Sequence, residues 1–125
     1  MIPYIQINWN KKGNNKLYFN NDFFKKTDGI SISYEKKSFD LDYFENTERI
    51  ILIFGETIIK DKIDNEDVIN KLLKIDLNKS DDFKKYLKNI NGQFLILIIV
   101  KDKNDFYIVN DRFNGIPVYY SNLEN

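Results

Sequence analysis

The chain has 125 residues, of which 42% are hydrophobic and 15% aromatic, and its 19 basic side chains balance 19 acidic ones. This composition excludes a disordered polar segment, and the zero net charge gives no support to a nucleic-acid partner. The sequence has no Cys and no His, which excludes disulfides, thiolate or imidazole metal sites, a thiol nucleophile and an imidazole base. Because it has neither a signal-peptide pattern nor an apolar run of membrane-spanning length, we expect a cytoplasmic protein with no membrane partner and a single domain over residues 1–125.

The first part of the chain is predicted to form β-strands. Residues 3–9 alternate loosely, and a turn over residues 11–15 leads into residues 17–19, which indicates an N-terminal hairpin. Residues 29–34 place apolar side chains at every second position, which is typical of a half-buried strand.

Two more strands are predicted before the middle of the chain. Residues 38–44 carry Phe39, Leu41 and Tyr43 at alternate positions. Residues 49–54 form a continuous apolar run, and we expect this buried strand to end at the glycine that follows it.

Helix signals occur only in the middle of the chain. Asp64 or Asn65 can cap a first helix, and Ser80 is a good N-cap for a second, with acidic residues in its first turn. The apolar side chains of both segments recur at helical spacing: Val68, Ile69, Leu72, Leu73 and Ile75 in the first, and Phe83, Tyr86, Leu87 and Ile90 in the second. The predicted order of elements is strands, two helices, strands.

The C-terminal part returns to strands. Asn91-Gly92 supplies a turn that can take positive φ, and residues 94–100 form an apolar run that predicts a strand covered on both faces. A polar loop over residues 101–105 then reverses the chain into a strand over residues 106–109. Asp111-Arg112, Gly115, Pro117 and Tyr119-Tyr120 follow in close succession.

This order of turns and strands resembles the end of the glutaminase-type domain of asparagine synthetase and its relatives, the class II glutamine amidotransferases. Phe54-Gly55-Glu56 matches two residues of the family's Asn-Gly-Glu motif, and Asn65-Glu66-Asp67-Val68 is similar to its Asp-Thr-Glu-Val helix start. The likeness covers roughly residues 50–120. It implies an α+β fold of the N-terminal-nucleophile (Ntn) hydrolase type, an αββα sandwich of antiparallel sheets, here shortened and degenerate.

The resemblance also implies which residues would react, and this chain lacks them. The family attacks glutamine with an N-terminal Cys whose own amino group is the base, whereas this chain starts Met1-Ile2. Phe54 stands where the family has the Asn that stabilises the oxyanion, and a phenyl ring donates no hydrogen bond. The family's carboxylate-binding Arg falls at Gly29, and its amine-binding Asp falls at Asn65. We therefore predict no catalytic residues and no glutaminase activity.

Two matched residues keep their family identity. Gly55 and Glu56 could form a vestigial ligand-binding site, although an exposed acid at a strand end is the simpler interpretation of Glu56. Asp111 and Arg112 could be a site remnant, and we interpret them as structural, with the carboxylate accepting from backbone amides and the guanidinium tying down a loop.

Three functions stay open at this point. The favoured one is a noncatalytic interaction domain that supports an ATP-dependent amide-forming synthetase, or that associates with itself. The chain has no phosphate loop of the synthetase type, so we expect no cofactor. The alternative is an adaptor that binds a peptide or small ligand, which a cavity beside Phe54 and Gly55 would favour. The third is an enzyme with a novel site of Asp, Glu, Lys and Tyr, for which no spacing singles out a constellation.

Overall fold

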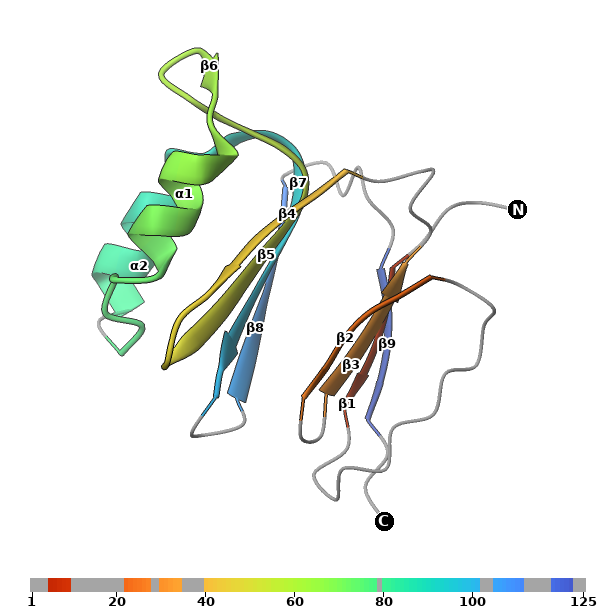
Figure 1. Cartoon of the computed structure of the whole chain (residues 1–125). Coiled ribbons are helices and arrows are strands. Elements are labelled where there is room, and N and C mark those ends of the chain that lie inside the picture. The colour runs from red at the N-terminus through yellow and green to blue at the C-terminus, as the bar shows by residue number, and fades with distance from the viewer. Residues whose placement is uncertain are drawn as a thin grey trace. The chain divides into compact units, whose positions relative to one another are not determined.

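A computed structural model describes residues 5–9, 22–27, 30–34, 40–78, 80–101, 105–111 and 118–122 (Figure 1). The chain divides into two compact units, one of Met1–Asp40 with Ile116–Asn125 and one of Leu41–Gly115. Strands precede and follow two helices, so the predicted α+β class and order of elements are confirmed.

The larger unit contains a five-stranded antiparallel sheet. Its main path runs in the order β4-β5-β7-β8, and β6 pairs with the far end of β5. The strands span β4 (Leu41–Glu45), β5 (Arg49–Ile59), β6 (Lys62–Ile63), β7 (Asn91–Val100) and β8 (Asp105–Asn110).

The two central strands, β5 and β7, have apolar residues on both faces. Ile53 pairs with Ile96 on the face toward the helices, and Phe54 pairs with Leu95 on the opposite face. All four side chains are buried, which confirms that these runs are strands covered on both sides. The burial of such runs is the main source of stability in a domain of this size.

Two helices, α1 (Asn65–Leu72) and α2 (Ser80–Lys88), cover one face of this sheet (Figure 1). Asp64 caps α1, and its carboxylate accepts a hydrogen bond of 3.0 Å from the backbone N–H of Asp67. The apolar side chains of the two helices pack against β5, β7 and β8. The buried residues of this core are Val68, Ile69, Leu72, Phe83, Ile90, Ile51, Ile53, Phe94, Ile96 and Ile98. The helical stripes are therefore used by the chain's own sheet, although Ile75 and Ile90 lie beyond the helix ends. Neither described helix is long and apolar enough to cross a membrane.

The smaller unit contains a four-stranded mixed sheet in the order β2-β3-β1-β9. Its strands are β1 (Ile5–Trp9), β2 (Asp22–Thr27), β3 (Ile30–Tyr34) and β9 (Val118–Asn122). β1 lies between β3, which is antiparallel to it, and β9, which is parallel to it. This parallel pair departs from the antiparallel sheets that the sequence predicted.

Several predicted boundaries need correction. Residues 17–19, the second strand of the predicted N-terminal hairpin, lie outside the described residues, and within the described residues β1 pairs with β3 and β9. β5 does not end at Gly55, and β7 begins at Asn91 instead of residue 94. Both glycines of this strand pair take positive φ, 92° at Gly55 and 112° at Gly92, within the ladder. Glycine here lets two strands continue through a distorted stretch instead of ending them.

Candidate functional site

Phe54, Gly55 and Glu56 lie in the middle of β5, where the resemblance placed a degenerate site. The side chain of Phe54 is 0% exposed, on the sheet face opposite the helices, so no part of it can reach a substrate from solvent. Glu56 is exposed, as the simpler interpretation expected, but it lies inside the strand and not at its end. The structure thus makes Phe54 a core residue and leaves Glu56 as a lone surface carboxylate.

Asn65, at the start of α1, uses its whole side-chain amide to hold two strands. Its Oδ1 accepts hydrogen bonds from the backbone N–H and the hydroxyl of Thr57, at 2.7 and 2.6 Å. Its Nδ2 donates to the carboxylate of Asp42 at 2.7 Å and to the carbonyl of Gly55 at 2.9 Å. An Asn side chain has two donor hydrogens and one oxygen that accepts two bonds, so these four bonds saturate it. Nothing on this side chain is left to bind a ligand.

Gly92 packs directly against the same part of β5. It pairs with Thr57, and a Cβ at this position would lie 2.3 Å from the carbonyl oxygen of Glu56. This oxygen belongs to the backbone, so it cannot rotate away as a side-chain atom could. Gly92, the second residue of the Asn91-Gly92 pair in the resemblance, is therefore required by the close approach of two strands.

Asp111 is bound to the neighbouring strand β7. Its Oδ2 accepts a hydrogen bond of 3.0 Å from the backbone N–H of Phe94, and its own N–H donates to the Phe94 carbonyl at 3.2 Å. The residue is only 6% exposed. This geometry agrees with the structural interpretation of Asp111, while Arg112 lies outside the described residues, as do Met1, Ile2 and Gly29.

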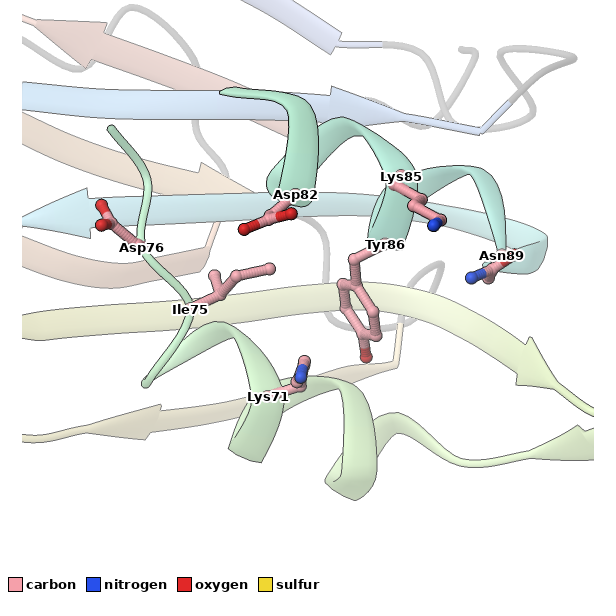
Figure 2. Close-up of a pocket in the computed structure, with 7 residues that line it drawn as sticks. All are labelled: Lys71, Ile75, Asp76, Asp82, Lys85, Tyr86 and Asn89. Atoms are coloured by element: carbon pink, nitrogen blue, oxygen red, sulfur yellow. The ribbon is translucent and has the colours of Figure 1, made fainter. Parts of the chain in front are cut away.

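A surface groove of about 350 Å³ lies between α1 and α2 (Figure 2). Its lining is amphipathic, with two lysines, two aspartates, an amide and two partly buried apolar side chains: Lys71, Lys85, Asp76, Asp82, Asn89, Ile75 and Tyr86. Neither Phe54 nor Gly55 lines it. The groove therefore does not lie beside these two residues, where a cavity would have favoured the adaptor function.

Tyr86 forms part of the floor of the groove and faces α1 (Figure 2). Its hydroxyl oxygen is buried and makes no hydrogen bond in the described part of the chain. Burial, with smaller contributions from Asp67 and Asp64, raises the pKa of Tyr86 to about 12, since both effects disfavour the phenolate. The ammonium of Lys71 lies 5.8 Å from the centroid of its ring, within range of a cation–π contact. Tyr86 is thus a neutral hydrogen-bond donor near neutral pH.

Sequence reasoning did not find this groove. Lys71, Asp82 and Lys85 lie on helix faces beside the apolar stripes, where charges are common, so only the packing of the two helices brings them together. Within the described residues, no three Asp or Glu side chains are grouped so that they could hold a metal ion. No protein-family model, no curated protein and no solved structure matched the chain.

Proposed function

We propose that this chain is a noncatalytic, glutaminase-like domain that supports an asparagine-synthetase-like, ATP-dependent amide-forming partner. In this proposal its fold is a shortened Ntn-hydrolase-type sandwich. The α+β class and the antiparallel sheet with two helices on one face are compatible with that fold. The sequence resemblance supports the proposed family, and the buried Phe54 and the fully bonded Asn65 amide support the proposed loss of glutaminase chemistry.

The observation that carries the proposal is the complete internal use of the Asn65 amide. Its four hydrogen bonds join α1 to β5 and to Asp42 in β4, at the position where the resemblance expects an acid that binds the substrate amine. Beside it, buried Phe54 replaces the expected oxyanion donor. Oxyanion stabilisation by a single donor is worth about two to three orders of magnitude in rate, so the replacement of that donor by Phe54 supports the proposed loss of glutaminase activity.

An interaction role also needs a surface for the partner. Phe44 on the edge strand β4 is 54% exposed, and Ile63 on β6 is 63% exposed. A partner that covers such side chains removes apolar surface from water, which favours association.

Co-purification tests the partner. The chain is mixed with a phosphate-loop synthetase from the same genome, and complex formation is measured by size-exclusion chromatography with light scattering. We expect a complex that Phe44→Ser or Ile63→Ser weakens and that Asn70→Ser, an exposed polar position on α1, leaves intact. A synthetase that is fully active alone and forms no complex would contradict the proposal.

A second candidate function is the binding of a small ligand or peptide by an adaptor. The groove between α1 and α2 favours it, because its volume falls in the range of small-molecule sites and its floor includes Tyr86, whose buried hydroxyl has no hydrogen-bond partner among the described residues. The two candidates are compatible, since the groove and the residues around Asn65 are separate.

A further inference from the structure

We propose that the groove between α1 and α2 binds a small dipolar ligand, one that carries an ammonium and a carboxylate at the two ends of an apolar spacer. The inference deepens the ligand-binding candidate and rests on it. It is independent of the synthetase partner, so its failure would leave that proposal untouched.

The charges in the groove cancel, and the acidic side chains lie apart from Lys85. Figure 2 shows Asp76 and Asp82 on the side of Ile75 and Lys85 on the other side of the Tyr86 ring, with Lys71 between Ile75 and that ring. A net anion would meet the two aspartates, and a net cation would meet the two lysines. A ligand with both charges can place each against its opposite, which is the arrangement that electrostatic complementarity favours.

Two of the charged groups in the groove are not used by the described part of the protein, whereas Lys71 lies over the ring of Tyr86. Asp82 and Lys85 are separated by less than one turn of α2, yet within the described part of the chain neither forms an ion pair. Asp76 accepts one hydrogen bond, from the backbone N–H of Asn78, and keeps its other oxygen for a ligand. The unpaired charges of Asp82 and Lys85 can therefore interact with charged groups of a ligand.

The floor between the two ends is apolar. Ile75 and the ring of Tyr86 are partly buried and belong to the margin of the helix-sheet core. A methylene spacer would cover them and lose contact with water, and this burial would favour a ligand whose charges are several carbons apart. Because both charged ends stay near solvent, we expect weak binding, with a dissociation constant on the order of 1 mM.

An NMR titration of the full chain with ω-amino acids tests the proposal. The probes are glycine, 4-aminobutyrate, 6-aminohexanoate and 8-aminooctanoate, with hexanoate and hexylamine as analogues of a single charge. We expect saturable shifts in the amides of α2 and of residues 71–76 for a dipolar probe of intermediate length. Since each analogue lacks one ion pair and leaves one charge unmatched, it should bind about tenfold more weakly.

Charge-neutralising variants locate the site. Asp82→Asn and Lys85→Gln should each raise the dissociation constant about fivefold, the loss of one exposed ion pair. Asp81→Asn and Lys84→Gln make the same charge changes one position earlier on α2, outside the groove lining, and should leave affinity unchanged. The absence of saturable shifts with every dipolar probe, equal weakening by the control variants, or equal binding of hexanoate or hexylamine would overturn the proposal.

Discussion

Two regions next to α1 are rich in polar side chains, and they use them in opposite ways. Around Asn65 each polar group of the amide is bound to the protein, whereas in the groove between α1 and α2 the charges of Asp82 and Lys85 form no ion pair within the described residues. The resemblance expects a substrate-binding residue in the first region and none in the second. The comparison teaches that residues singled out by a resemblance can have a structural role, while the polar groups that are open to a ligand lie in another region.

Gly92→Ala should have the largest effect, because it changes the closest contact between strands in the region around Asn65. The new Cβ would lie 2.3 Å from the Glu56 carbonyl oxygen, at a φ of 112° that side chains rarely adopt. We expect the free energy of unfolding, measured by urea denaturation, to fall by about 3 kcal/mol or more. Asn91→Ala, at the exposed neighbouring position, should change it little, and a stable Gly92→Ala protein would refute the close approach of the strands.

Asn65→Ala should follow in size. It removes four hydrogen bonds and leaves the buried backbone N–H and hydroxyl of Thr57 without their acceptor. We expect a loss of about 2–3 kcal/mol in the same measurement.

The control is Asn70→Ala, on the exposed face of the same helix, which makes the same change in helix propensity. It should be neutral or slightly stabilising. Equal effects of the two variants would mean that the Asn65 network contributes nothing, and the contrast between the two regions would be lost.

Tyr86→Phe probes the groove region and should stabilise the protein. It removes a buried hydroxyl that has no partner in the described residues, and we expect a gain of up to about 1 kcal/mol near neutral pH. If the hydroxyl is instead satisfied by the protein, the variant will be less stable than the wild type.

The raised pKa of Tyr86 also predicts a pH dependence. The unfolded chain releases this proton near the ordinary pKa of 10.0 and the folded chain at about 12, so ionisation above pH 10 favours the unfolded chain and stability falls as the pH rises toward 12. Thermal unfolding across this range should therefore show a steeper loss for the wild type than for Tyr86→Phe. Parallel curves would contradict the buried position of the hydroxyl.

The smallest predicted effect concerns the turn between β5 and β6. Lys60 and Asp61 both have positive φ, 51° and 65°, between the paired residues Ile59 and Lys62, which is the geometry of a type I′ turn. Replacing them together by Asn and Gly should raise stability by about 0.5 kcal/mol, because these residues adopt that geometry with less strain. A lower melting temperature would contradict the assigned turn.

The strength of the local signal decided which parts of the fold were predictable. The apolar runs of β5 and β7 and the stripes of the two helices depend on hydrophobic periodicity, which is present in the sequence itself. β2 contains a Lys pair and β9 follows a proline, so neither segment has a clear strand pattern, and β9 is defined by a parallel pairing with residues more than 100 positions away. Gly55 was misread as a strand end because glycine also serves as a distortion inside a strand.

The candidate site was less predictable than the fold. The position of Asn65 at a helix start was visible, but its contact with Asp42 spans 23 positions and depends on how β4 packs beside β5. The groove depends on the angle and offset of two helices, which no local pattern encodes. Residue types alone showed which chemistry was absent, and only the three-dimensional arrangement showed what the remaining polar groups do.

Glutamine hydrolysis tests the central claim most directly. The purified full chain is incubated with glutamine, and released ammonia is measured against heat-denatured protein and against the Asn65→Ala variant. We predict that the wild type releases no more ammonia than the denatured control, because Phe54 is buried and the Asn65 amide is fully bonded. Glutamine-dependent ammonia release by the wild type would contradict the account.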